Sequence, residues 1–180
     1  MSKCQKIYLE RLMANKKKIF IAVDTNKVSK AQKIIKDTQT EKIKIGYKFG
    51  LEFFFSKDGR KFISSLRNQI IFLDLKLNDI PNTVSSAIKS LKNLNIAYLT
   101  VHISSGLNAL KALKKDSKNI KIAGVTTLTS LNNKDLKEIG FNKKVNELVR
   151  HQARLAKKAK LDAIICSGHE IGSVKSVLIK

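Results

Sequence analysis

Residues 72–84 read FLDLKLNDIPNTV, and the fold prediction starts from this stretch. Its apolar beginning predicts a buried strand. Side chains alternate along a strand, so Asp74 and Lys76 should point to one face while the leucines between and after them point to the other. Pro81 suits the first turn of a helix, where its fixed φ and missing N–H are tolerated. The stretch therefore predicts a strand, a short polar loop containing Asp79, and a helix.

The same alternation of strand and helix extends in both directions along the chain. Short apolar runs predict strands at residues 19–23, 43–49, 70–75, 97–102, 120–126 and 163–166. Apolar residues at helical spacing follow each of these runs. Strands that are apolar throughout and that alternate with helices indicate a parallel sheet covered by helices. We therefore predict an α/β fold with six βα units.

Two architectures can hold such a sheet, a doubly wound open sheet and a barrel. No G-x-G-x-x-G follows the first predicted strand, which argues against a dinucleotide-binding fold. Polar residues stand at the ends of many different strands: Asp24, Lys48, Asp74, Lys76, His102, Thr129 and Ser167. A TIM (β/α) barrel gathers its chemistry in this way, at the carboxyl ends of its strands. We predict one barrel domain over residues 1–180, with about six of the eight βα units present.

The ends and the cysteines of the chain fit a cytoplasmic protein. Residues 1–18 lack the apolar region of a signal peptide, and Leu9, Leu12 and Met13 predict an amphipathic helix that closes the bottom of the barrel. Cys4 and Cys166 match neither a metal-ligand spacing nor a disulfide scaffold.

The charge of the chain is unusual. Lys and Arg number 36 against 14 Asp and Glu, a formal net charge of +22. One interpretation is a surface that binds nucleic acid or another anion. The other is a drift toward lysine codons in an AT-rich genome. The basic residues are spread along the chain without interleaved aromatic residues, which favours the second interpretation and makes a nucleic-acid partner unexpected.

The spacing Asp74-x-Lys76-x-x-Asp79 carries the chemistry of the predicted site. Two carboxylates and an ammonium buried so closely must neutralise one another. A neighbouring carboxylate also keeps a lysine charged, and thus able to donate a proton. On spacing alone, a structural salt bridge at the barrel rim and a catalytic network both remain open.

The complete set of residue types in this stretch is more specific than the spacing of its charged residues. Residues 72–84 closely resemble the signature of the orotidine 5′-phosphate decarboxylases. Five further segments resemble motifs of that family in the same order: IAVD at 21–24, KFGLEFF at 48–54, TVHISSG at 100–106, VTTLTS at 125–130 and LDAIICSGHE at 161–170. The resemblance extends from about residue 19 to about residue 174.

This resemblance implies a lyase that converts orotidine 5′-phosphate to uridine 5′-phosphate in pyrimidine biosynthesis, without cofactor or metal. Lys48, Asp74, Lys76 and Asp79 would form its charged network. Lys76 would donate a proton to C6 of the pyrimidine, and Asp74 would lie beside the substrate carboxylate.

The resemblance also implies the remaining substrate contacts and a homodimer. Asp24 and Lys48 would contact the ribose, and Asp79 would reach the active site of the partner subunit. The complete set of implied substrate-binding residues is Asp24, Lys48, Asp74, Lys76, Asp79, Ile80, Pro81, Asn82, Thr83, Thr129 and Ser130.

The chain departs from the family pattern after the sixth predicted strand. The last two βα units of the family, which carry its phosphate-binding groups, have no counterpart in the 180 residues, so we expect an incomplete barrel. Two alternatives to the decarboxylase therefore stay open. One is an inactive remnant, and the other is a metal-dependent sugar-phosphate decarboxylase or aldolase that shares D-x-K-x-x-D. The continuation D-I-P-N-T argues against the sugar-phosphate enzymes.

Overall fold

The structure is a computed structural model that describes residues 18–41 and 43–178. Apart from residue 18, the amphipathic helix predicted for residues 1–18 lies outside the described residues. The chain forms two compact units, residues 1–72 and residues 73–180. The single barrel domain stays a prediction.

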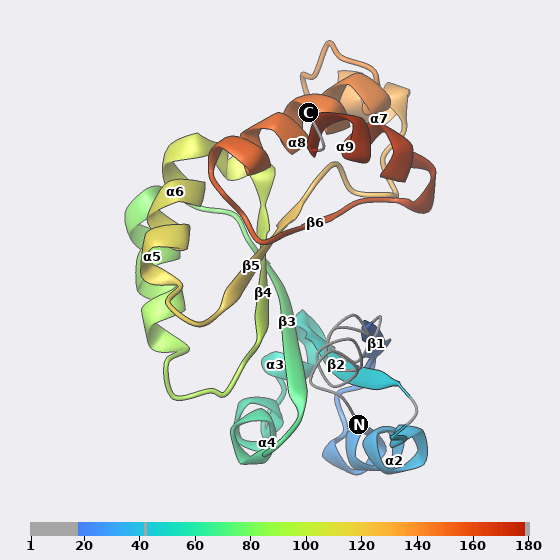
Figure 1. The fold of residues 1–180 in the computed structure, drawn as a ribbon, viewed down its shortest axis with the longest axis vertical. Helices are drawn as coiled ribbons and strands as arrows, with labels where there is room; N and C mark the ends of the chain where they lie inside the picture. The colour runs from blue at the N-terminus through green and yellow to red at the C-terminus, as the bar shows by residue number, and fades with distance from the viewer. Residues whose placement is uncertain (1–17, 42, 179–180) are drawn as a thin grey trace, which may run out of the picture. The chain divides into compact units, whose positions relative to one another are not determined.

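The first unit begins with a parallel strand pair. Strand β1 (Lys18–Ala22) pairs with β2 (Lys44–Gly50), and helix α2 (Val28–Thr38) connects them (Figure 1). The Tyr47 hydroxyl of β2 donates a hydrogen bond to the Ile35 carbonyl of α2 at 3.1 Å. This bond satisfies a polar group on a side chain that is otherwise buried in the core.

Two short helices, α3 (Leu51–Phe54) and α4 (Gly59–Ser65), complete the first unit. Phe49 of β2, Phe53 of α3 and Phe62 of α4 form an aromatic cluster, with ring centroids 4.9 to 6.4 Å apart. The sequence predicted a helix around Phe62 but not α3, because four residues are too few to show a helical period.

The second unit continues the βα alternation. Its strands are β3 (Ile70–Leu77, which begins in the first unit), β4 (Tyr98–His102), β5 (Lys121–Val125) and β6 (Ala163–Ile165). Its helices are α5 (Pro81–Ser90), α6 (Gly106–Asp116), α7 (Asn133–Glu138), α8 (Val145–Lys158) and α9 (Ile171–Leu178), with 3₁₀ turns η1 (Ile103–Ser105) and η2 (Gly168–Glu170).

The strands follow one another in the sheet in chain order, β1-β2-β3-β4-β5-β6. The pairs β4–β5 and β5–β6 are parallel, with Leu99 opposite Ile122 and Gly124 opposite Ile164. The predicted α/β class with six βα units is therefore confirmed. A parallel sheet in chain order brings the carboxyl ends of its strands to one edge, which positions the candidate site.

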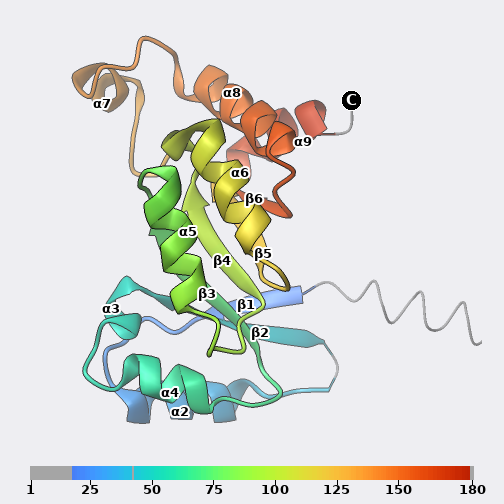
Figure 2. The same cartoon turned by 90° about the vertical axis from the view of Figure 1, so that its left-hand side faces the viewer.

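Helices cover the strands of the second unit. α5 and α6 lie side by side against β4 and β5, and α8 packs against α9 (Figures 1 and 2). Between α8 and α9, Val149, Ala153 and Val174 form a buried cluster that Cys166 joins. Burial raises the pKa of the Cys166 thiol, and Glu170 adds to this effect. Cys166 is thus a packing residue, as the sequence indicated.

Helix α7 was not predicted from the sequence. Its one buried residue is Leu136, so it shows no apolar stripe. A capping box begins it: the Asn132 side chain accepts from the backbone N–H groups of Lys134 and Asp135, and Asp135 accepts from the N–H of Asn132. None of the helices in the described residues is long and apolar enough to cross a bilayer.

Candidate active site

Asp74 and Lys76 form an ion pair at the carboxyl end of β3. The Lys76 ammonium Nζ lies 2.9 Å from Asp74 Oδ2. The Asp74 side chain is 14% exposed and the Lys76 side chain 34%, so one face of the pair meets solvent. The structure thus brings together the two residues that the sequence placed on one face. A partly buried pair of this kind holds a positive charge where a ligand can reach it.

Thr100 of β4 connects the backbone of Lys76 to the carboxylate of Asp74. Its hydroxyl accepts the Lys76 backbone N–H at 2.8 Å and donates to Asp74 Oδ1 at 3.0 Å. Thr100 is only 1% exposed. Asp74 therefore accepts a hydrogen bond at each carboxylate oxygen, one from the ammonium and one from a buried hydroxyl, which fixes its orientation.

Lys76 adopts a backbone conformation that is rare for lysine. Its φ is +47°, in the left-handed region. This conformation costs a residue with a Cβ atom about 1–2 kcal/mol. Lys76 is the last residue but one of β3, and its N–H donates to the side-chain hydroxyl of Thr100 in the neighbouring strand β4. Strain of this kind persists where the surrounding structure fixes it, and it is often found at functional sites.

His102 lies beside the ion pair, at the end of β4. Burial lowers the pKa of its imidazole below the ordinary 6.5, and the positive charge of Lys76 lowers it further, while Asp74 opposes both effects. From the sequence alone, a hydrogen-bonded structural histidine is favoured over a site residue at this position. Within the described residues its imidazole makes no hydrogen bond, so electrostatics and burial define its environment.

The loop after β3 is tied to the loop after β4. Ser105 donates a hydrogen bond to Asn78 Oδ1 at 2.9 Å. The next residue, Asp79, is exposed, and its Oδ1 accepts the N–H of Ile80 at 2.7 Å. Ile80 is 65% exposed, an unusual position for an isoleucine. Pro81, at the first position of α5, is also exposed.

The first turn of α5 and the loop after β5 carry the other residues predicted to bind substrate in this unit. Asn82, Thr83, Thr129 and Ser130 are all exposed. The loop after β5 is anchored at Thr127, whose backbone N–H and side-chain hydroxyl both donate to Gln152 Oε1, at 2.8 and 3.2 Å. Gln152 was not predicted from the sequence, because a single polar residue within a helical stripe is not distinctive.

Asp24 and Lys48 belong to the first unit. Ala22 lies opposite Lys48 in the parallel register, and the N–H of Val23 donates to the Lys48 carbonyl at 2.9 Å. The two predicted residues therefore stand at the ends of neighbouring strands. Their part in one network with Asp74 and Lys76 stays a prediction.

Beside Gln152, sequence reasoning missed Thr100 and Asn78, which hold the ion pair and its loop. A signal for Thr100 exists in the sequence. Apart from Tyr98, it is the one polar residue in the otherwise apolar run 97–101. It also stands two positions before His102, so both side chains point to the same face of the strand.

Comparison with known proteins places this geometry in a family. Residues 17–179 match the model of the "Orotidine 5'-phosphate decarboxylase / HUMPS family". An orotidine 5′-phosphate decarboxylase of Carboxydothermus hydrogenoformans is 35% identical over 170 residues, which cover 89% of this chain and 70% of the relative. The enzyme of the Wolbachia of Brugia malayi is 42% identical over 162 residues, which cover 87% and 70%.

Solved structures agree with the sequence relatives. A crystal structure of orotidine 5′-phosphate decarboxylase from Lactobacillus acidophilus has a TM-score of 0.76 and 28% identity, covering 89% of this chain and 75% of that one. An uncharacterised conserved protein of Geobacillus kaustophilus has a TM-score of 0.81 and 27% identity, covering 88% and 78%. The predicted barrel class is thereby confirmed, with six strands in the part of the chain that the structure describes. By its sequence and its fold, the chain belongs to the orotidine 5′-phosphate decarboxylase / HUMPS family.

Proposed function

We propose that this protein decarboxylates orotidine 5′-phosphate to uridine 5′-phosphate in pyrimidine biosynthesis, with Lys76 as the proton donor. The observation that carries the proposal is the Asp74–Lys76 pair at 2.9 Å, partly open to solvent at the carboxyl end of β3. It lies within the segment matched by the family model and by relatives named as orotidine 5′-phosphate decarboxylases.

The residue types suit the chemistry of this reaction. When the bond between C6 and the carboxylate carbon breaks, its electron pair stays on C6 and carbon dioxide leaves. The charge that develops on C6 must be stabilised by a positive group that is already in place. The Lys76 ammonium supplies that charge and then transfers one proton to C6, leaving a neutral amine that solvent reprotonates.

Asp74 has two roles in this proposal. Its carboxylate keeps Lys76 protonated and directs the ammonium through the 2.9 Å contact. It also stands beside the substrate carboxylate, whose loss relieves the repulsion between the two anions. Thr100 holds the carboxylate in place for both roles.

The remaining predicted residues extend the site. We assign Asp24 and Lys48 to the ribose, and Thr129 and Ser130 to the base. We assign Asp79 to the active site of a partner subunit in a homodimer. The exposure of the neighbouring Ile80 supports an interface there, because a large apolar side chain in water favours contact with another surface.

The experiment is conversion of orotidine 5′-phosphate by the purified chain in D₂O with excess chelator. We expect uridine 5′-phosphate that carries deuterium at C6, detected by mass spectrometry, because the proton comes from an exchangeable lysine. Deuterium at C6 without a metal requirement supports the proposal. Turnover of a sugar phosphate that depends on Mg²⁺, with orotidine 5′-phosphate left unchanged, would assign the chain to the other branch of the superfamily.

A further inference from the structure

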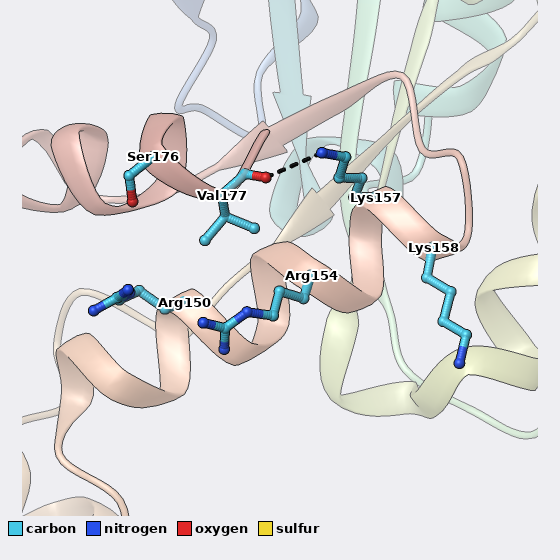
Figure 3. A pocket seen from close by; sticks show the side chains of 6 residues that line it. All are labelled: Arg150, Arg154, Lys157, Lys158, Ser176 and Val177. Atoms are coloured by element: carbon cyan, nitrogen blue, oxygen red, sulfur yellow. Dashed lines mark hydrogen bonds between the residues drawn. The ribbon is translucent and has the colours of Figure 1, made fainter. Parts of the chain in front are cut away.

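A basic hollow of about 510 Å³ lies between α8 and α9, apart from the Asp74–Lys76 site. Four cationic side chains line it together with a hydroxyl and one apolar group: Arg150, Arg154, Lys157, Lys158, Ser176 and Val177 (Figure 3). Its volume is within the range of sites that hold small molecules. No carboxylate is among these lining residues.

The positive charge of this basic hollow is not neutralised within the described part of the chain. None of its four cations forms an ion pair there, whereas Lys76, Lys89 and Lys114 each pair with an aspartate. A second hollow, lined by Asp58 and Lys61 among others, contains both signs of charge. The basic residues of this protein are numerous, but this cavity differs in gathering them without an acid.

Lys157 is held in place by the end of α9. Its ammonium donates to the carbonyls of Val177 and Leu178, both at 3.2 Å. These carbonyls lie in the last turn of α9, where no helical N–H reaches them. An ammonium has three N–H donors, so one remains for a ligand. The charge is therefore already positioned before an anion arrives, which reduces the entropy lost on binding.

Arg150 and Arg154 stand one helical turn apart on α8, and their guanidinium groups extend in the same direction (Figure 3). Two such planar forks can each bind a phosphate through paired hydrogen bonds. Lys158 extends away from the two arginines in the same view. Helix α9, which carries Ser176 and Val177, is held against α8 because Val149 and Ala153 of α8 are buried against Val174 of α9.

The basic hollow is distant from the ion pair along the strands. Lys157 and Lys158 end α8, immediately before β6 begins, whereas Asp74 and Lys76 lie where β3 ends. In a parallel sheet, these are opposite edges. A ligand in the basic hollow would therefore not compete with a substrate at Lys76.

We propose that the basic hollow binds an oligophosphate anion, with at least two linked phosphate groups. Its cations match several negative charges in a row, and its lining includes no aromatic residue on which a base could stack. The phosphate chain is thus the recognised part, whether it comes from an inorganic oligophosphate or from a nucleoside triphosphate. Its four exposed cations make the affinity sensitive to salt.

The test is calorimetric titration of the full 180-residue chain with inorganic triphosphate and, separately, with uridine triphosphate, at one fixed low ionic strength. We expect one site per chain and dissociation constants for the two ligands within about threefold of each other, since the base adds no contact. In the variant R150Q/R154Q, the affinity should fall at least about tenfold, because charge-assisted hydrogen bonds are lost.

Two control variants make the result specific. K111Q/K115Q removes two exposed charges at the same helical spacing from α6, and it should keep the affinity within about twofold. Lys76→Ala should bind triphosphate as the wild type does. The proposal would be overturned by equal losses of triphosphate affinity in the two double variants, or by a loss of that affinity in Lys76→Ala. The absence of saturable binding to the wild type would overturn it too. Binding of a single-stranded RNA without binding of triphosphate would overturn it as well and indicate a nucleic-acid surface.

Discussion

Lys76 combines three features that are seldom found in one residue. It has a left-handed backbone, an ammonium paired to the aspartate two positions earlier, and an N–H held by a buried threonine. Each feature restricts where the ammonium can lie. A proton donor for a carbanion needs such restriction, because the charge must stand at one atom when the carbon–carbon bond breaks.

Thr100 should position the pair without touching substrate. Thr100→Val keeps the shape of the side chain but removes the acceptor for the Lys76 N–H and the donor to Asp74. We expect kcat for orotidine 5′-phosphate to fall about ten- to a hundredfold, with KM changed less than about threefold.

Thr100→Ser is the matched control for this prediction, since it restores the hydroxyl and loses only a methyl group. It should recover most of the rate. If the valine and serine variants lose the same activity, packing rather than the two hydrogen bonds explains the position of Thr100.

His102 should make the stability of the second unit depend on pH. The pKa of its imidazole is lowered in the folded chain, so between that value and the ordinary 6.5 the unfolded chain binds more protons. The contribution of neutral His102 to the free energy of unfolding is fully present above about pH 6.5, and it is lost as the pH falls toward the lowered pKa. His102→Gln should therefore lose less stability than the wild type between about pH 7.5 and about pH 5.5.

Urea unfolding at the two pH values measures this difference. His151→Gln, a change at an exposed histidine of α8, is the control for loss of an imidazole. An identical loss of stability in the wild type and in His102→Gln would show that the environment of His102 has no influence on folding.

Among the secondary-structure elements, one aspartate connects three: helix α6, strand β5 and the start of β6. Asp162, just before β6, accepts from the Lys114 ammonium of α6 at 2.6 Å and from the Ile122 N–H of β5 at 2.7 Å. Partial burial raises the pKa of Asp162, but the hydrogen bonds from Lys114 and Ile122 outweigh this effect and leave it lowered. The start of β6 is thereby fixed to the sheet and to a covering helix.

Asp162→Ala should lower the free energy of unfolding by about 1–3 kcal/mol at neutral pH, because a partly buried N–H and an ammonium lose their acceptor. Because the pKa of Asp162 is lowered in the folded chain, its carboxylate stabilises the fold fully above its ordinary pKa of 3.8. This stabilisation is lost as the pH falls through the pKa of the folded state. The difference between wild type and variant should shrink below about pH 4.

A matched control is Glu138→Gln, which breaks the exposed Lys134–Glu138 pair of α7. Denaturant titration should show a loss below about 0.5 kcal/mol for that variant. Equal losses for the two variants would mean that the Asp162 contacts contribute no more than a surface ion pair.

The sequence predicted the elements that show an apolar run or an apolar stripe at helical spacing, and it missed α3 and α7, which show no helical period. All six predicted strands appear at or within two residues of their predicted positions, because the strands of a parallel sheet covered by helices form short apolar runs. α3 is too short to show a period, and α7 is defined by its capping box around Asn132 rather than by packing. Leu91 and Leu94 continue the apolar stripe of α5 and are buried, yet the helix ends at Ser90.

At the scale of the whole molecule, the sequence predicted the Asp74–Lys76 pair of the candidate site but not the residues that orient it. Asp74 and Lys76 follow from strand alternation and from the family motif. The hydrogen bonds of Thr100 and the tie between Asn78 and Ser105 depend on how neighbouring strands are registered. Register is a tertiary property that one sequence without relatives does not specify.

The proposed homodimer gives a test in which two inactive variants restore each other. Lys76→Ala and Asp79→Ala should each be inactive alone. In a mixed dimer, one of the two shared sites would keep both residues, so refolding the variants together should recover about a quarter of the wild-type activity with random pairing. Activity that stays absent after demonstrated mixing would show that Asp79 does not act across an interface.

The decisive measurement follows the loss of orotidine 5′-phosphate absorbance with the wild-type chain and with Lys76→Ala side by side, in the presence of a chelator. We predict that the wild type forms uridine 5′-phosphate, and that Lys76→Ala is slower by at least about a thousandfold while it unfolds in the same cooperative transition. Turnover that survives in Lys76→Ala would show that Lys76 is not the proton donor. A folded wild-type chain that leaves the substrate unchanged would show that the chain is not a decarboxylase of orotidine 5′-phosphate.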